Sequence, residues 1–407
     1  MKKEPDIRFE GFVDDWEQRK LGKVFKTYSG MTPLRSDISN FKNPEVPWIK
    51  TTDLKNSDIT SNDEKISAKA ANKLKVLPVN TVLIAMYGGF NQIGRTGLLT
   101  YPATINQALT ALEPNDSISP YFLLTELNYR VNDWKKFAAS SRKDPNITKR
   151  DIDNFMINFP TQQEQQKIGS FFQQLDNTIT LHQQKLELLK KTKKGYLQKM
   201  FPKNGETVPE IRIEGFSGEW EQGQLKDILN ISKEKNKSEK YSREQVLSVS
   251  REAGTVNQIE YQGRSFAGAN ISGYKVVKPN QMIYTKSPLK GAPYGIFQKV
   301  TVEGIVSPLY AVYDSTEKAL ASFISLQLKD DNLATHYLSP LVSKGAKNTI
   351  NITDEGALMG KVYYPSKSEQ SEIVDFFSKY DIALSQQQKQ LELLKSLKKS
   401  LLQKMFI

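Results

Sequence analysis

The feature that most constrains this chain is a duplication that spans nearly its whole length. The segment IRFEGFVDDWEQ (7–18) returns as IRIEGFSGEWEQ (211–222), with 8 of 12 residues identical at an offset of 204. The stretch 160–201 returns as 365–406, with 20 of 42 residues identical at an offset of 205. A chain that repeats itself in this way is expected to build two copies of one structural unit.

The best matched part of each repeat is a long amphipathic tail. Each tail follows a proline and opens with a signature that predicts a helix N-terminus, Thr161 with Glu164 and Ser366 with Glu369. Apolar residues then recur at alternating steps of four and three, over about five heptads, which indicates a coiled-coil seam. The residues predicted to pack the helix pair are Ile168, Phe172, Leu175, Ile179, Leu186, Leu189, Ile373, Phe377, Leu384, Leu391 and Leu394.

Each predicted helix needs a partner for its apolar stripe. At 1.5 Å per residue, a tail of roughly 36 residues forms a rod about 54 Å long. The simplest partner is the other rod, and equivalent helices related by a pseudo-two-fold axis pair antiparallel. His182 and Gln387 interrupt the two seams at matching positions, where a polar residue usually fixes the register. The alternative is that each helix packs on its own globular segment.

The segments ahead of the tails read as mixed α/β. Short apolar runs such as TVLIAMY (81–87), separated by Gly, Pro and Asn, predict strands. The sequence therefore predicts a mixed α/β (α+β) protein with a pseudo-two-fold internal repeat. Two globular domains, 1–159 and 204–364, are separated by an antiparallel pair of long coiled-coil helices, 160–203 and 365–407.

Composition narrows the function classes. The chain carries 57 Lys+Arg against 45 Asp+Glu, a net charge of +12, which favours a polyanionic partner. The absence of cysteine excludes disulfides, zinc–thiolate sites and thiol catalysis. The N-terminus shows no apolar leader, and no stretch approaches the roughly 18 apolar residues that span a bilayer. We therefore expect a cytoplasmic protein with no membrane partner.

The sequence shows no recognisable set of catalytic or metal-binding residues. GFNQIGRT (89–96) resembles a phosphate-binding loop, but it has Arg95 where the loop needs lysine, and the next residues read as a strand. The two histidines, His182 and His336, have no partner at metal-ligand spacing. We expect no catalytic residue, metal or cofactor in this chain, although an enzyme without a recognisable motif remains the alternative.

Basic loops precede both predicted helices. The offset of 205 aligns SSRKDPNITKR (140–150) with SKGAKNTINIT (343–353). Both mix cations with Ser and Asn, which contact phosphates and base edges in DNA complexes; the alternative is a solvated surface loop. The residues predicted to contact DNA are Arg95, Arg142, Lys143 and Asn146 in the first repeat, and Arg264, Lys286, Lys290 and Lys347 in the second.

The order of a variable segment, a long helix, a second variable segment and a similar helix resembles the specificity subunit of type I restriction–modification systems. The residues that carry the resemblance are EGFVDDWEQRKLGKVF (10–25), EGFSGEWEQGQLKDIL (214–229), VPWIKTTDL (46–54), GIVSPLYAV (304–312) and the LELLK…LQKMF helix ends (186–201, 391–406). Together these motifs cover essentially the entire chain.

The resemblance implies a division of labour. The two globular domains would be target recognition domains, each reading one half of a bipartite target in double-stranded DNA. The paired helices would set the gap and dock two methyltransferase subunits, and motor–endonuclease subunits would join the full complex. S-adenosylmethionine, ATP and magnesium would then belong to those partners, and this chain would be non-catalytic. A stand-alone DNA methyltransferase or nuclease, or a coiled-coil protein-binding scaffold, is the alternative.

Overall fold

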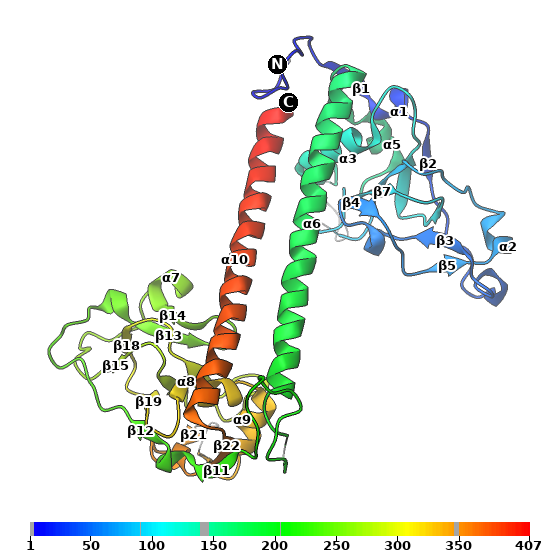
Figure 1. Cartoon of the computed structure of the whole chain (residues 1–407). Helices are drawn as coiled ribbons and strands as arrows, with labels where there is room; N and C mark the ends of the chain where they lie inside the picture. Colours follow the sequence, from blue (N-terminus) through cyan, green and yellow to red (C-terminus); the bar gives the residue numbers. More distant parts are fainter. Residues whose placement is uncertain (1–3, 90, 139–145, 204, 346–349) are drawn as a thin grey trace. The chain divides into compact units, whose positions relative to one another are not determined.

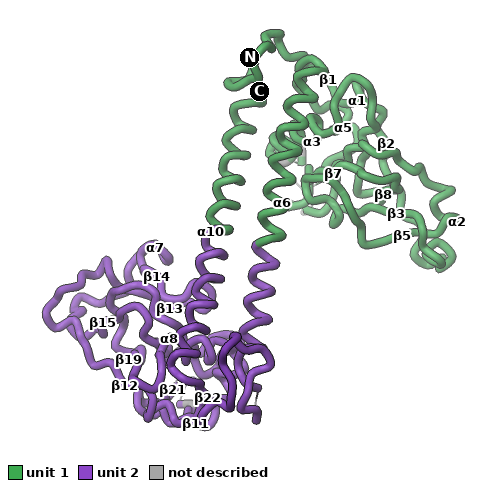
Figure 2. Tube along the Cα trace, viewed as in Figure 1, with its two compact units in different colours: residues 1–185, 387–407 green, residues 186–386 purple. Residues whose placement is uncertain are grey.

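The computed structural model divides the chain into two compact units (Figure 2). Unit 1 comprises residues 1–185 and 387–407, and unit 2 comprises residues 186–386. Each unit holds one globular segment together with part of both long helices, α6 (Gln162–Lys199) and α10 (Lys367–Met405) (Figure 1). We call the globular segment of unit 1 (residues 4–159) head 1 and that of unit 2 (residues 205–364) head 2. The structure describes residues 4–89, 91–138, 146–203, 205–345 and 350–407.

Head 1 combines short strands with short helices. Its elements in chain order are β1 (Glu17–Lys20), α1 (Leu21–Val24), β2 (Thr27–Ser29), β3 (Val46–Ile49), β4 (Ser57–Ile59), β5 (Lys65–Ile66), α2 (Ala68–Ala71), β6 (Val82–Ala85), β7 (Thr96–Leu99), β8 (Thr104–Ile105), β9 (Leu109–Leu112), α3 (Pro120–Tyr129), α4 (Val131–Phe137), α5 (Lys149–Asn154) and β10 (Met156–Phe159). A 3-10 turn, η1 (Ile38–Asn40), lies between β2 and β3.

The main sheet of head 1 has the strand order β2-β9-β6-β7-β4. Its central strands β6, β7 and β9 are buried along their whole length, as expected for apolar runs that are covered on both faces. β1 pairs antiparallel with β10, which leads directly into α6. The strand β7 follows Arg95, so the prediction that a strand rather than a helix comes after this loop is confirmed.

Head 2 repeats this arrangement with different loops. Its elements are β11 (Glu221–Gln224), β12 (Leu229–Ile231), β13 (Leu247–Ser250), β14 (Gly254–Asn257), α7 (Gln258–Gln262), β15 (Lys275–Val277), β16 (Met282–Tyr284), β17 (Phe297–Lys299), β18 (Gly304–Val306), β19 (Ala311–Ser315), α8 (Ala321–Gln327), α9 (Asp331–Leu338), β20 (Ser343–Lys344), β21 (Ile350–Asn351) and β22 (Lys361–Tyr364).

The sheets of the two heads are equivalent. The order β12-β19-β16-β17 in head 2 matches β2-β9-β6-β7 in head 1, and the pair β11-β22 matches β1-β10. The loop between β2 and β3 in head 1 therefore corresponds to the loop between β12 and β13 in head 2. The predicted mixed α/β fold with an internal repeat and two long helices is confirmed.

The long helices pair antiparallel within each unit. In unit 1, Asp176 of α6 forms an ion pair with Lys398 of α10, and the Gln387 side chain is 2.6 Å from His182 Nδ1. Residues 182 and 387 differ by the repeat offset of 205, so they occupy equivalent positions in the two repeats. In unit 2, the repeat-related residues Lys193 and Asp381 form the corresponding ion pair.

The predicted seam residues are all buried or half-buried. Those near the helix starts also pack on the heads, since Ile168 and Phe172 belong to the core of head 1, and Ile373 and Phe377 belong to that of head 2. Each long helix therefore packs both on the other helix and on its own head, at different places along its apolar stripe.

A fully buried glutamine links each head to its long helix. The Gln165 amide donates to the carbonyl oxygens of Pro160 and Ser117 and accepts from the Ser119 N–H at 2.9 Å. Gln370 makes the same three contacts in unit 2, with Pro365, Lys318 and Leu320. Buried amides with all their hydrogen bonds made orient the packed elements strictly.

Candidate nucleic-acid interface

Two segments that carry predicted DNA-contacting residues come together in head 1. The loop between β6 and β7 ends at Arg95, which is half-buried and whose Nε donates to the Asn91 carbonyl oxygen at 2.9 Å. The segment with the half-buried Asn146 lies beside the start of this loop, because the Ile147 N–H donates to the Met86 carbonyl oxygen at 3.0 Å. The structure thus places the segment that carries Asn146 beside the loop that carries Arg95.

Two of the predicted lysines of head 2, Lys286 and Lys290, lie on the equivalent loop, between β16 and β17. Lys286 binds Asp354 at 2.6 Å, and Lys275 binds the other carboxylate oxygen at 2.6 Å. Burial acts to raise the pKa of Asp354, but the hydrogen bonds from Lys275 and Lys286 outweigh it and lower the pKa. Lys286 therefore anchors this loop to the segment that leads to α10, whereas Lys290 is exposed at the loop tip.

Arg264 belongs to a different loop of head 2, which follows α7. Its guanidinium stacks 4.7 Å from the centre of the Phe266 ring, and both side chains are exposed. The loop backbone is held by Gln258, whose side-chain oxygen accepts from the Phe266 N–H at 2.6 Å. An exposed cation on an anchored loop can contact a phosphate with little ordering cost. The remaining predicted residues, Arg142, Lys143 and Lys347, lie outside the described residues.

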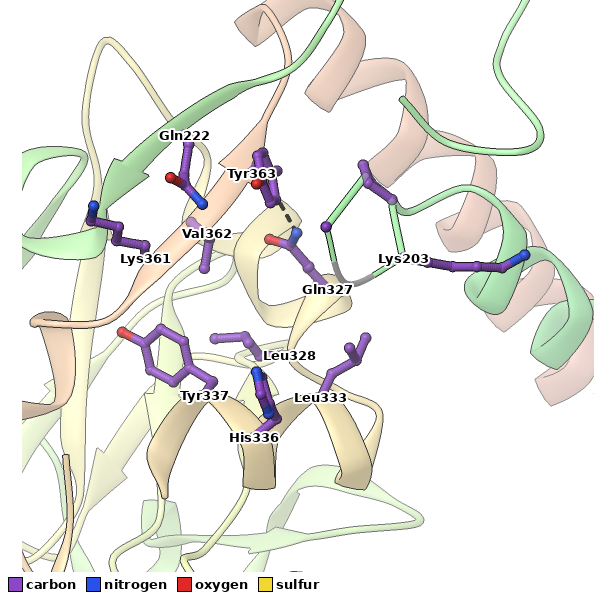
Figure 3. Close-up of a pocket in the computed structure, with 12 residues that line it drawn as sticks. Lys203, Gln222, Gln327, Leu328, Leu333, His336, Tyr337, Lys361, Val362 and Tyr363 are labelled. Atoms are coloured by element: carbon purple, nitrogen blue, oxygen red, sulfur yellow. Dashed lines mark hydrogen bonds between the residues drawn. The ribbon is translucent and has the colours of Figure 1, made fainter. Parts of the chain in front are cut away.

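A cavity of about 260 Å³ in unit 2 lies beside α9 (Figure 3). His336 and Tyr337 line one side of it, and Gln327 donates to the Tyr363 carbonyl oxygen on another. The twelve lining residues include no carboxylate, hydroxyl-bearing Ser or Thr, or second histidine. Such a lining has no carboxylate to pair with His336, and it does not offer a set of metal ligands.

The described residues contain no group of three or more His, Asp or Glu side chains placed to hold a metal ion. Within the same ranges, no helix is both long enough and apolar enough to cross a membrane. The candidate interface consists of basic and polar loops on the two heads.

Sequence reasoning missed the ion pairs that fasten the heads. The helix-start glutamates were expected to cap their helices, but each carboxylate instead binds an arginine 156 or 157 residues away. Arg8 contacts both oxygens of Glu164 at 2.7 and 2.8 Å, and Arg212 contacts both oxygens of Glu369 at 2.8 and 2.7 Å. The hydrogen bond that Arg8 donates to Glu164 raises the pKa of Arg8. The repeat could have indicated these ion pairs, because both arginines lie in the duplicated segment at 7–18 and 211–222.

Comparisons with known proteins agree with this architecture. Residues 13–191 match the family described as type I restriction modification DNA specificity domain. The chain is 27% identical over 171 residues to the type I restriction enzyme EcoR124I/EcoR124II specificity subunit of Escherichia coli, covering 40% of this chain and 42% of that protein. It is 26% identical over 235 residues to the MjaIX specificity subunit of Methanocaldococcus jannaschii, covering 54% and 53%. The matched segments thus span about half of these relatives.

A solved structure shares the fold over the full length. The crystal structure of the type I restriction-modification system S subunit from M. genitalium superposes with a TM-score of 0.65, covering 99% of both chains at 15% sequence identity. At this identity the likeness shows the fold.

Proposed function

We propose that this chain is the non-catalytic, DNA-reading specificity subunit of a type I restriction–modification complex, on the basis of the family match over residues 13–191 and of its curated relatives. Each head reads one half of a bipartite target in double-stranded DNA. The observation that carries the proposal is the pair of similar heads, each attached to the long helices by the same contacts. The match of residues 13–191 to a DNA specificity domain supports it.

The partners follow from this assignment. Two methyltransferase subunits dock on the helix pair, and motor–endonuclease subunits complete the assembly. In this proposal S-adenosylmethionine, ATP and magnesium are bound by those partners. The complex acts in the cytoplasm.

The helix pair sets the gap between the two half-sites. Deleting residues 183–189 and 388–394 removes one heptad from each helix at equivalent positions and preserves the phase of the seam. The pair becomes about 10 Å shorter, which corresponds to about 3 base pairs. Mapping methylated adenine in DNA from cells that express the chain with its methyltransferase should show the gap shortened by that amount. An unchanged gap would exclude the spacer role.

The predicted cations contact DNA phosphates in this proposal: Arg95, Arg142 and Lys143 in head 1, and Arg264, Lys286, Lys290 and Lys347 in head 2, with Asn146 as a polar contact. Neutralising one phosphate contact should flatten the salt dependence of DNA binding by about one unit of slope. The effect should be larger for Lys290→Gln than for Lys286→Gln, because Lys286 is already paired with Asp354. Unchanged slopes for all seven cation variants would remove this assignment.

Two results would refute the proposal as a whole. Cutting or methylation of DNA by the purified chain alone would make it an enzyme. The absence of any sequence preference in the complex with its methyltransferase would make it a protein-binding scaffold.

A further inference from the structure

The equivalent loops of the two heads expose different side chains. In head 1, the loop between β2 and β3 exposes three large apolar side chains within eight residues: Met31 is 55% exposed, Leu34 74% and Ile38 78%. The corresponding loop of head 2, between β12 and β13, exposes five cations. These are Lys233, Lys235, Lys237, Lys240 and Arg243, interspersed with three exposed acids.

The apolar loop of head 1 is firmly held. The indole N–H of the buried Trp48 donates to the Met31 carbonyl oxygen at 3.3 Å, and the buried Asn40 amide donates to the Leu34 carbonyl oxygen at 3.1 Å. Arg35 stacks over Phe41 and Trp48 and binds Glu64 at 2.8 Å. The backbone is therefore fixed while its apolar side chains face solvent, as in a preorganised binding loop.

The cationic loop of head 2 is anchored in a related way. The buried Asn236 donates to the Tyr241 carbonyl oxygen at 2.9 Å and accepts from the Tyr241 N–H at 3.1 Å. Because the two loops occupy the same place in equivalent sheets, one class of partner should meet both. Five exposed cations on one of them favour a polyanion as that partner.

We infer that Met31, Leu34 and Ile38 contact thymine methyl groups in the major groove, so that head 1 reads part of its half-site through apolar contacts. This inference rests on the proposed function. The thymine methyl is the apolar feature of the major groove, and aliphatic side chains are its usual protein contacts. A cluster of exposed apolar side chains on a monomer marks an interaction surface. Head 2 instead uses its cationic loop on phosphates.

Uracil, which lacks the methyl group, provides the test. The complex of the chain with its methyltransferase is titrated with a duplex that carries its methylation target, and thymines are replaced by uracil in one half-site at a time. We expect uracil in the half-site of head 1 to weaken binding about three- to five-fold per methyl contacted. Uracil in the other half-site should have no such effect.

The triple variant Met31→Ser, Leu34→Ser and Ile38→Ser should bind the thymine duplex as weakly as the wild type binds the uracil duplex. It should no longer respond to uracil, and its salt slope should be unchanged because no charge is altered. The matched control is Val76→Ser with Val79→Ser, two valines of head 1 that are 48% and 42% exposed. This control should keep the wild-type response.

The outcomes separate the inference from the proposed function. If the wild-type complex has no sequence preference, the proposed function fails. If it has one, but neither half-site responds to uracil or the triple variant keeps the response, the inference alone fails. A triple variant that loses its methyltransferase while keeping wild-type DNA affinity would show that the loop docks protein, and this too would overturn the inference.

Discussion

Unit 1 and unit 2 share the contacts that hold a head on the helix pair and differ in what each head presents. Both use an arginine bound to a helix-start glutamate, a fully buried glutamine and an aromatic helix end. They differ in the loop after the first strand of the main sheet and at one position of α3 and α8, which holds the buried Glu126 in unit 1 and the half-buried Gln327 in unit 2. The comparison teaches that the two repeats retain the contacts that attach each head to the helices, while their exposed loops differ.

The largest effect should come from the aromatic helix ends. Phe406 packs among Trp16, Phe122 and Phe172 in unit 1. Phe201 packs in the corresponding core of unit 2. Phe406→Ala and Phe201→Ala should each lower the free energy of unfolding by about 3–5 kcal/mol in urea titrations.

The matched controls for these variants are Leu188→Ala and Leu393→Ala, at equivalent exposed positions, which should cost within about 0.5 kcal/mol. A small loss for Phe406→Ala alone would break the equivalence of the two units, because the chain end would then be dispensable in unit 1.

The arginine–glutamate pairs should come next. Arg8→Ala or Arg212→Ala leaves a carboxylate that is at most 2% exposed without its partner, so each should cost about 2–4 kcal/mol. Replacing both partners, Arg8→Met with Glu164→Leu, should cost much less, since no buried charge remains. Equal losses for the double and the single variant in urea titrations would contradict this explanation, because the cost would then not come from the unpaired carboxylate.

Glu126 and Gln327 occupy equivalent positions on α3 and α8. The Asn158 N–H donates to the Glu126 carboxyl at 3.5 Å, whereas Gln327 donates to the carbonyl oxygen of Tyr363, the residue equivalent to Asn158. Burial raises the pKa of Glu126 to about 7 from 4.5, against the opposing effect of Arg130. Folding therefore takes up a proton, and the contribution of Glu126 to stability falls as the pH rises from 4.5 through 7.

Exchanging glutamate and glutamine between these two positions should move the pH dependence of the free energy of unfolding from unit 1 to unit 2. Glu126→Gln should raise the free energy of unfolding at pH 8 by roughly 1–3 kcal/mol and have little effect at pH 4.5. Gln327→Glu should produce the opposite change in unit 2. Urea titrations at several pH values would measure both. A Glu126→Gln variant that keeps the wild-type pH profile would assign the titration to another group.

The smallest effect should come from the pair of repeat-equivalent residues on the two helices, His182 and Gln387. His182→Gln makes the pair Gln–Gln, and Gln387→His makes it His–His, so each retains a hydrogen-bonding side chain on the seam. Each should change the free energy of unfolding by less than about 1 kcal/mol. A loss above about 2 kcal/mol in either variant would show that the two helices are not interchangeable at this point.

Much of the fold could be predicted from the sequence because its signals are local. The heptad spacing depends on residues three and four apart, so it predicted both long helices and placed every seam residue on a buried or half-buried stripe. The repeat offset predicted that His182 and Gln387 would occupy equivalent positions, and the structure pairs them.

The candidate site was less predictable because exposure and pairing depend on remote strands. Lys286 and Lys290 look alike in the sequence, but only the fold brings Asp354 to Lys286. Met31, Leu34 and Ile38 have the residue types of a core, yet the path of the chain after β2 leaves them exposed.

The sequence by itself determined the duplication, the two helices and the phase of their seam, since these are properties of short-range periodicity and of self-similarity. Only the tertiary structure decided which glutamates bind Arg8 and Arg212, which cations are already paired, and which apolar side chains face solvent. The physical reason is that these outcomes depend on contacts between segments that lie 68 to 157 residues apart in the chain, or on the absence of such contacts, and no local pattern encodes them.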